Sequence, residues 1–483
     1  MSGPRSIGLF REGAERVVVL ALWFGLATGL VEVVLVAIRK FALHRLVRLS
    51  PHVVWMAPAA DIALFIVAAL LLIAVGRFRP RLLALRPAST VFAALSFFTI
   101  SLHYGPIAMY ARIILAAGLG VQAGYFIGKY PDRFTRFLTW TVGWPGRLAA
   151  KVRSKSRAST DAGVRARDVQ LELGPFLSGA TAIVATLAGA VHVWGWSTER
   201  AAWSRLPSGA TGPNIVLIVW DTVRARSLSL YGYERSTTPQ LEAFADGAAV
   251  FDRAFATSPW TLPTHASLFT GRWHHELSVD WEDPLDTAYP TLAEFLVGRG
   301  YATAGFVANT YFGSVEHGLN RGFVHYEDYR RSPGQALVSS ALGSDLACGV
   351  RNKPGCKLRD LVGYHELLGR KTAAHVSRAF LRWLDRRPAG RPFFAFLNYM
   401  DAHAPYLPPE PFATRFGKGE RGNPMHMEWA DWQWTPAQAK AEQDAYDGAI
   451  AYLDDQLGRL LGELDARGLL ENTIIVLTSD HGE

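Results

Sequence analysis

Two short polar segments, far apart in the chain, carry the residue types of a metal-dependent active site. Asp221 directly follows the apolar run Ile215–Trp220, and the pair Asp480-His481 closely follows a second run, Asn472–Thr478. Apolar runs of this length are typical of covered strands in a parallel sheet. Because parallel strands present their ligand-binding groups at their carboxyl ends, we expect Asp221, Asp480 and His481 to meet there. Carboxylate and imidazole groups are ligands for a divalent cation.

A third segment, Ser258–Gly271, supplies a possible nucleophile. Pro263 suits the first turn of a helix and Gly271 suits its end, which predicts a short helix through His265 to Phe269. Thr261 would then lie just ahead of the helix N-terminus, where unpaired N–H groups bind phosphate or sulfate oxygens. As a fourth ligand, its hydroxyl would be activated by the cation. The alternative role for Thr261, and for Asp221, is that of a helix cap.

The order of these motifs resembles the sulfatase branch of the alkaline phosphatase superfamily. The resemblance covers roughly Pro213–Glu483 and includes the stretches Gly300–Asn309 and Met400–Tyr406. It implies an α/β domain with a mainly parallel sheet, in an enzyme that acts on phosphate or sulfate esters. Family members continue past the Asp-His-Gly-Glu motif, so the resemblance also implies that this domain is incomplete at its C-terminus.

Departures from the sulfatase pattern indicate phosphate rather than sulfate as the transferred group. Sulfatases have Cys or Ser at the position of Thr261, and its oxidation gives an aldehyde, whereas Thr would give a ketone. His265 stands where sulfatases have Arg, and Thr222 replaces the second Asp of their usual pair. A Thr nucleophile with an Asp, Asp, His metal site resembles lipoteichoic acid synthases and phosphoethanolamine transferases, which form a phospho-threonine intermediate. Two alternatives remain: a sulfuric ester hydrolase with unmodified Thr, and a non-catalytic protein with a degenerate domain.

Other polar residues have candidate roles in this resemblance. His403 matches the family's His-x-Pro-Tyr segment, which implies contact with the transferred anion or the leaving group, although it could be a structural turn residue. His403 or His265 could protonate the leaving oxygen, and His275 and Asn309 are weaker candidates. His274, His317 and His426 are expected at the surface. The ligand set suits Mn, Mg, Ca or Zn without choosing between them.

The N-terminal part of the chain has the composition of a membrane domain. Hydrophobic residues make up 49% of the 483 residues, which is high for a wholly soluble protein. Five apolar stretches approach or reach the length that crosses a bilayer, at residues 17–38, 53–75, 88–104, 107–127 and 176–196. We therefore expect a multi-pass α-helical domain over residues 1–196, a linker over 197–212 and the catalytic domain over 213–483.

Positive charges predict the orientation of the membrane domain. The most basic segment, from Arg133 to Arg167, lies between the fourth and fifth predicted spans and belongs in the cytoplasm. The catalytic domain then faces the outside of the cell membrane, in a cell that we expect to be bacterial, although the loop after Arg39 argues for the opposite orientation. Glu32, Asp61 and Arg112 lie inside the spans, where they either lie near helix ends or pair within the bundle, or else receive a lipid head group.

The net charge of +8 does not indicate a nucleic-acid partner, because much of the excess lies in loops that flank the membrane. The expected partners are the lipid bilayer and a phospholipid or glycan ester substrate. Cys348 and Cys356 could close a disulfide across a short turn-rich loop or remain thiols.

From Pro213 onward, apolar strand patterns alternate with amphipathic helical ones. The predicted helices are at residues 237–247, 291–299, 371–386 and 436–467, and the further strands at 303–308, 393–399 and 473–478. This alternation predicts a mostly parallel sheet with helices on both faces.

Overall fold

The computed structural model describes residues 4–142, 171–281, 283–347, 370–418 and 434–483. The proposed Cys348–Cys356 disulfide and His426 lie outside these residues. The chain divides into two compact units. We call them the helical unit, Met1–Gly195 with Arg331–Ala347, and the sheet unit, Trp196–Arg330 with Cys348–Glu483.

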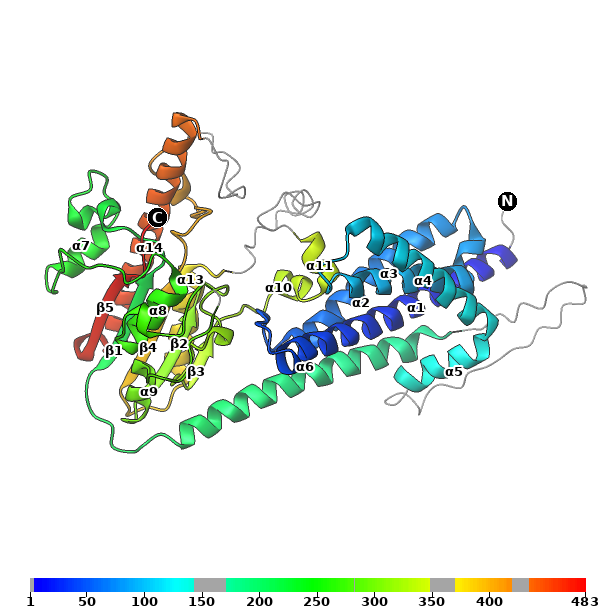
Figure 1. Cartoon of the computed structure of the whole chain (residues 1–483), viewed down its shortest axis with the longest axis horizontal. Helices are drawn as coiled ribbons and strands as arrows, with labels where there is room; N and C mark the ends of the chain where they lie inside the picture. The colour runs from blue at the N-terminus through cyan, green and yellow to red at the C-terminus, as the bar shows by residue number, and fades with distance from the viewer. Residues whose placement is uncertain (1–3, 143–170, 282, 348–369, 419–433) are drawn as a thin grey trace, which may run out of the picture. The chain divides into compact units, whose positions relative to one another are not determined.

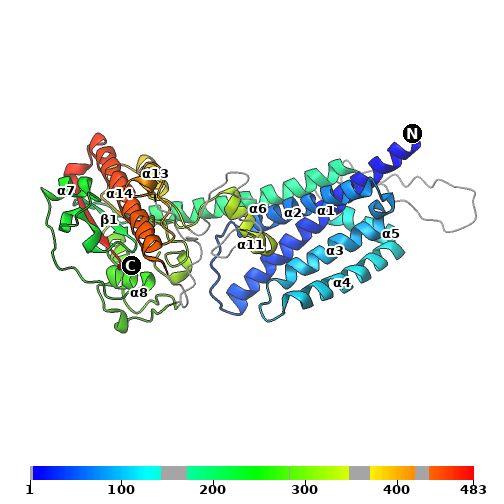
Figure 2. The ribbon, with the colours of Figure 1, turned by 90° about the horizontal axis from the view of Figure 1, so that it is seen from above.

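The helical unit is a bundle of long helices. Its elements are α1 (Pro4–Ala37), α2 (Val53–Gly76), α3 (Leu85–Ser101), α4 (Met109–Lys129), α5 (Pro131–Val142), the first part of α6 (Leu173–Ser204), α10 (Pro333–Val338) and α11 (Ala341–Leu346). Figure 2 shows α1 to α4 lying side by side. A Cβ added at Gly29 of α1 would lie 2.3 Å from Cα of Pro58 in α2. The lack of a side chain therefore lets the backbones of these two helices touch.

Four helical stretches among the described residues are long and apolar enough to cross a membrane. They are Phe10–Ala42, Val53–Gly76, Met109–Lys129 and Leu173–Ser204, and they coincide with the first, second, fourth and fifth predicted spans. The third predicted span falls on α3, which has 17 residues.

Helix α6 continues to Ser204, through the first eight residues of the predicted linker. The residues predicted as a linker therefore begin inside this helix. Glu199, Arg200 and the alanines that follow have high helix propensity, and the single Gly195 does not stop the helix.

The polar residues of the spans are buried in the bundle. Glu32, Asp61 and Arg112 are 1%, 0% and 9% exposed, and each makes hydrogen bonds inside the helical unit. Of the two interpretations, pairing within the bundle is the one that the structure shows.

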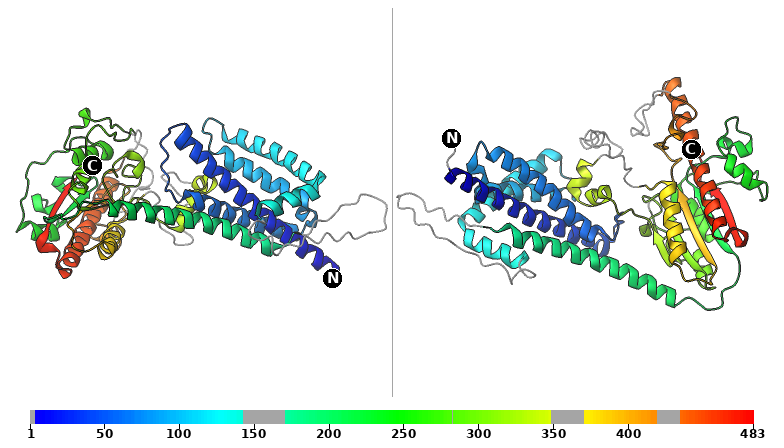
Figure 3. Two further views of the ribbon diagram at one scale, coloured as in Figure 1. Left: turned by 90° about the horizontal axis from the view of Figure 1, so that it is seen from below. Right: turned by 180° about the vertical axis from the view of Figure 1, so that it is seen from behind.

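The sheet unit contains a five-stranded parallel sheet. The strands are β1 (Asn214–Trp220), β2 (Ala302–Val307), β3 (His325–Glu327), β4 (Phe393–Tyr399) and β5 (Thr473–Ser479), in the order β3-β2-β4-β1-β5. Figure 3 shows the strands from two further directions. Trp220 pairs with Tyr399 on one side and with Ser479 on the other. The segments that follow β1, β4 and β5 therefore leave the sheet at the same edge.

Helices cover both faces of this sheet (Figure 1). They are α8 (Thr261–Thr270), α9 (Leu292–Val297), α13 (Ala373–Arg386) and α14 (Pro436–Ala466), whereas α7 (Pro239–Ala245) packs against α14. In β1, Val216 and Ile218 pack in the core that includes α13 and α14, whereas Leu217 and Val219 pack in the core that includes α8 and α9. Burial on both faces explains the unbroken apolar run. The predicted fold class, an apolar helical region followed by an α/β domain with a mainly parallel sheet, is confirmed.

The prediction that His317 lies at the surface is wrong. Its side chain is 0% exposed, and its Nδ1 lies 3.1 Å from the hydroxyl oxygen of Ser314. The short helix Val315–His317 turns the ring inward, where a hydroxyl partner compensates the loss of water. His274 is exposed, as predicted.

Candidate active site

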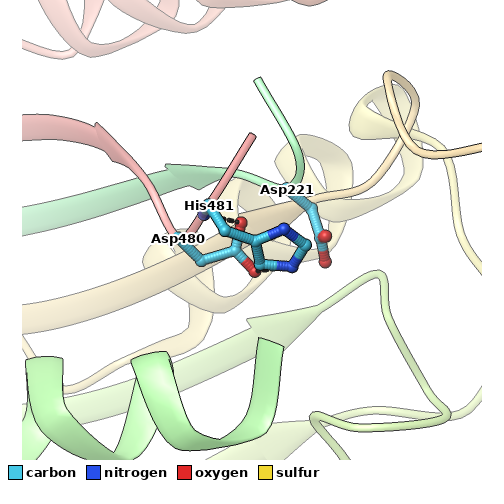
Figure 4. Close-up of side chains that lie close together, drawn as sticks. All are labelled: Asp221, Asp480 and His481. Carbon is cyan, nitrogen blue, oxygen red and sulfur yellow. Dashed lines mark hydrogen bonds and ion pairs between the residues drawn. The ribbon is translucent and has the colours of Figure 1, made fainter. Parts of the chain in front are cut away.

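The candidate site lies at the carboxyl edge of the sheet, where β1 and β5 end. Asp221 directly follows β1, and Asp480 and His481 directly follow β5 (Figure 4). Each of these residues offers one ligand atom, and the three atoms all lie within 4.8 Å of one another. The structure thus brings together the three residues that were predicted to meet at the carboxyl ends of these strands.

Asp221 is fully buried and is held by one of its two carboxylate oxygens. The side-chain amides of Asn309 and Asn398 donate to Oδ2, over 3.0 and 3.3 Å. Oδ1 has no hydrogen-bond partner among the described residues. A buried carboxylate oxygen without a partner is costly, so this atom has the property expected of a metal ligand.

Asp480 is held in the same way. The backbone amides of Thr222 and His481 donate to Oδ1, over 3.1 and 2.8 Å, whereas no group of the described chain hydrogen-bonds to Oδ2. Thr222 adopts a left-handed conformation with φ of 63°, which is rare for a β-branched residue. Its hydroxyl bonds to main-chain oxygens, one of them that of Ala402. Thr222 therefore holds Asp480 by its backbone, and its side chain does not replace the missing second Asp.

The two carboxylates disfavour each other's charge. Burial raises the pKa of Asp221, and the neighbouring Asp480 raises it further, while His403, Asn309 and His265 act in the opposite direction. Burial also raises the pKa of Asp480, against the effect of His481. A cation held between the two carboxylates would offset both burial and repulsion. The donor set, two carboxylates with an imidazole, therefore fits a divalent metal ion.

Thr261 lies beside this cluster. Its hydroxyl oxygen is 3.3 Å from Nε2 of His481, and the other ring nitrogen, Nδ1, is 3.0 Å from the carbonyl oxygen of Gly482. The second contact leaves Nε2 as the nitrogen that faces the site. Thr261 is the first residue of α8 and not the residue ahead of it, a difference within the usual uncertainty of helix ends.

His265 lies beneath the first turn of α8. Its Nδ1 is 2.8 Å from the carbonyl oxygen of Thr261 and 3.7 Å from Oδ2 of Asp480. The ring packs edge-on against Phe396 and is almost completely buried. Burial lowers the pKa of His265, against the effect of Asp221. A neutral ring with Nδ1–H donating to Thr261 fixes the main chain that carries the hydroxyl.

His403 lies in the segment after β4, which leaves the same edge of the sheet. Its Nδ1 is 2.8 Å from the carbonyl oxygen of Ala404, and its electrostatic effect lowers the pKa of Asp221. Asn309 also belongs to the site, through its bond to Asp221. His275 is exposed on the short helix His274–Glu276, and within the described part of the chain it is not one of the residues gathered around Asp221 and Asp480.

Arg370 is a site residue that the sequence did not indicate. Its guanidinium donates to the carbonyl oxygens of His403 and Pro405, over 2.8 and 3.0 Å. Its backbone forms an antiparallel bridge with Asn309. Arg370 thus fixes two of the segments that surround the cluster, yet it stands directly before α13 with no motif around it.

A family model described as Sulfatase matches residues 213–483. The chain belongs to the sulfatase family, and the resemblance found in its motifs is confirmed. The arylsulfatase of Clostridium perfringens is 27% identical over 308 residues, which cover 56% of this chain and 63% of that protein. Human arylsulfatase A is 25% identical over 307 residues, which cover 56% of this chain and 52% of that protein. The chain thus spans about half to two thirds of the length of these relatives.

Solved structures with a similar fold include the C-terminal periplasmic domain of EcEptC from Escherichia coli in complex with Zn. It is 19% identical with a TM-score of 0.39, over 58% of this chain and 66% of that one. The phosphonate monoester hydrolase of Agrobacterium radiobacter is 23% identical with a TM-score of 0.41, over 56% of this chain and 63% of that one.

Proposed function

We propose that the protein is a metal-dependent enzyme that transfers a phosphate-linked group through Thr261. The observation that carries this proposal is the position of the Thr261 hydroxyl, 3.3 Å from His481 and beside two buried carboxylates. Membership of the sulfatase family supports an enzyme that acts on sulfate or phosphate esters.

The residue type of the nucleophile favours phosphate. A threonine cannot be oxidised to the aldehyde that sulfatases use, so its hydroxyl must attack directly. In the reaction we propose, the hydroxyl oxygen of Thr261 bonds to the phosphorus of a phosphodiester, and the bond to the alcohol breaks. A water or a second alcohol then attacks the phospho-threonine and releases Thr261. Hydrolase and transferase differ only in this acceptor.

The residues of the site have separate roles in this reaction. When bound by Asp221, Thr261, Asp480 and His481, a divalent cation such as Mn, Mg, Ca or Zn would favour ionisation of the hydroxyl and stabilise negative charge on the phosphate oxygens. Thr261 is the first residue of α8, so the positive end of the helix dipole lies beside its hydroxyl and would suit an oxyanion. His403 is the candidate that protonates the leaving alcohol, while His265 holds the main chain of Thr261.

The apolar helices support a substrate that is held in a membrane. Four stretches of the described chain are long and apolar enough to span a bilayer. We propose that the sheet unit works at the outer face of a bacterial cell membrane, on the head group of a phospholipid or on a glycan ester. The basic segment between Arg133 and Arg167 supports this orientation.

A sulfuric ester hydrolase is the second candidate, because the curated relatives named above are arylsulfatases. The two candidates are separated by assaying one purified protein, with the same divalent metal, on a soluble aryl phosphodiester and on the matching aryl sulfate. We expect turnover of the phosphodiester that is lost in Thr261→Ala. Faster turnover of the sulfate would contradict the proposal, and no turnover of either ester by a metal-loaded protein would favour the non-catalytic alternative.

A further inference from the structure

Two carboxyl groups are buried inside the helical unit. Glu32 belongs to α1 and Asp61 to α2, and their side chains are 1% and 0% exposed. His103, just after α3, lies 3.2 Å from Oε1 of Glu32. Ionisable side chains within apolar helices are costly and are retained mostly where they bind something. Complete burial excludes both carboxyl groups from contact with a free lipid head group in this conformation.

The group that these carboxyls bind is a segment of the same chain. Residues 331–347, with α10 and α11, are inserted between β3 and α13 of the sheet unit, yet they pack into the helical unit. The backbone amide of Ala341 donates to Oε1 of Glu32 over 3.0 Å. The hydroxyl of Ser340 donates to Oδ1 of Asp61 over 2.5 Å.

These contacts leave the segment well fixed. Ser340 is itself fully buried, and its hydroxyl oxygen also accepts from the backbone amide of Gly343. The neighbouring Ser339 reaches the sulfur of Met56 in α2, over 3.8 Å. The side chains of Glu32 and Asp61 also share a hydrogen bond with each other. Loss of the segment would leave Asp61 without its hydroxyl donor and Glu32 without the backbone amide of Ala341.

We propose that Glu32 and Asp61 form a docking site for residues 331–347, and that this docking couples the catalytic domain to its membrane-held substrate. The chain passes between the two units at residues 195–196, 330–331 and 347–348. The last two of these crossings are the two ends of the docked segment. The coupling to catalysis rests on the proposed function. The docking does not, because the contact between the segment and the two carboxyl groups can be measured without any assay of activity.

Docking is tested by crosslinking a pair of cysteines placed across the contact between the segment and α2. Met56→Cys and Ser339→Cys are introduced into the full chain, in a background with Cys348→Ser and Cys356→Ser. The decisive variant is Ala341→Pro, which removes the N–H that Glu32 accepts. Proline suits this position, because Ala341 is the first residue of α11 and Ser340 is extended with ψ of 143°. Ala341→Ser keeps the N–H and is the matched control.

We expect Ala341→Pro to lower the rate of crosslinking about tenfold, since it removes a buried hydrogen bond between the segment and Glu32. Ala341→Ser should crosslink like the parent protein. Glu32→Ala and Asp61→Ala remove the acceptors and should act in the same direction, with Glu172→Ala, an exposed glutamate of the same unit, as their control. Equal crosslinking in Ala341→Pro and Ala341→Ser would overturn the docking site, whether or not the two carboxyl variants fold.

Coupling is tested by comparing one phosphodiester in two forms, soluble and embedded in phospholipid vesicles. We expect Ala341→Pro to lower turnover of the embedded ester about tenfold while turnover of the soluble ester stays within about twofold. Equal losses on both esters, or no loss on either, would overturn the coupling. If the parent protein turns over neither ester, the proposed function fails, and the crosslinking result still decides the docking.

Discussion

The hydroxyl oxygen of Thr261 lies 3.3 Å from Nε2 of His481, although the two residues belong to distant parts of the sheet unit's sequence. The contact exists because β5 pairs with β1 in parallel, with Ser479 opposite Trp220. This register carries His481 and Asp480 to the position of Asp221, while α8 brings Thr261 to the same edge. The proposed chemistry depends on this juxtaposition of a hydroxyl with three ligand groups.

Two replacements of Thr261 should distinguish the contribution of its hydroxyl to turnover from that of its methyl group. Thr261→Ala removes the nucleophile and should lower turnover of a phosphodiester at least about 1,000-fold. Thr261→Ser keeps the hydroxyl and loses one buried methyl, so its turnover should stay within about tenfold of the parent protein. Thr270→Ala, at the far end of α8, is the control for loss of a threonine from the same helix. Equal activity of the Ala and Ser variants would contradict a nucleophilic role.

Removal of the metal should abolish turnover reversibly. A chelator should stop the reaction and lower the unfolding temperature, because a cation offsets the repulsion between Asp221 and Asp480. Asp480→Asn should weaken metal binding at least about 100-fold by calorimetric titration. Asp454→Asn, which changes a buried carboxylate elsewhere in the sheet unit, should bind the metal normally. Unchanged metal affinity in Asp480→Asn would exclude this residue from the metal site.

Arg370→Lys should affect catalysis without affecting the metal. A lysine can hold only one of the carbonyl oxygens of His403 and Pro405 that the guanidinium now holds together. We expect kcat to fall about tenfold because His403 is less well placed, with metal affinity and unfolding temperature close to those of the parent protein. A parallel loss of metal affinity would show instead that Arg370 supports the whole site.

The stability of the sheet unit should depend on pH through Asp454. Its carboxylate accepts from the backbone amides of Gln240 and Leu241 in α7, over 2.9 and 2.8 Å. Burial raises the pKa of Asp454 to about 6. The folded protein thus binds this proton more tightly than the unfolded chain, so lowering the pH through 6 stabilises the folded state, by on the order of 2 kcal/mol.

Asp454→Asn cannot take up this proton. The unfolding temperature of the parent protein, relative to that of Asp454→Asn, should therefore rise as the pH falls from 7 to about 5. The exposed Asp283→Asn serves as the surface control. A difference that shrinks over the same interval would mean that the sign of the linkage is wrong.

Much of the fold was predictable because its signals are local. Burial on both faces of the sheet produces the unbroken apolar runs of β1 and β4. The apolar run of β5 predicted a covered strand as well, but β5 lies at the edge of the sheet, where Ile474 and Val476 are exposed. A strand that ends in Asp221 or in Asp480-His481 marks the ligand edge directly. The same patterns could not reveal the role of Arg370. Its guanidinium acts on the main chain of His403, and a contact with a backbone oxygen leaves no motif in the sequence.

Other features depended on tertiary contacts. Nothing in the sequence around Ser340 and Ala341 distinguishes them from an ordinary helix start, so their contacts with Asp61 and Glu32 could not be foreseen. The left-handed backbone of Thr222 is stabilised by bonds to Asp480 and Tyr446, which are distant in sequence. The burial of His317, whose ring lies beside Phe312 and Ser314, was likewise not apparent from the sequence.

The central claim is that Thr261 becomes covalently attached to a phosphate-linked group, and intact mass spectrometry tests it most directly. The protein is incubated with a divalent metal and phospholipid vesicles, quenched in acid and compared with Thr261→Ala. We predict a mass increase that matches a phosphorylated head group in the parent protein and is absent from the variant. An adduct of equal yield in Thr261→Ala, or hydrolysis of a sulfate ester that survives this substitution without any adduct, would contradict the claim.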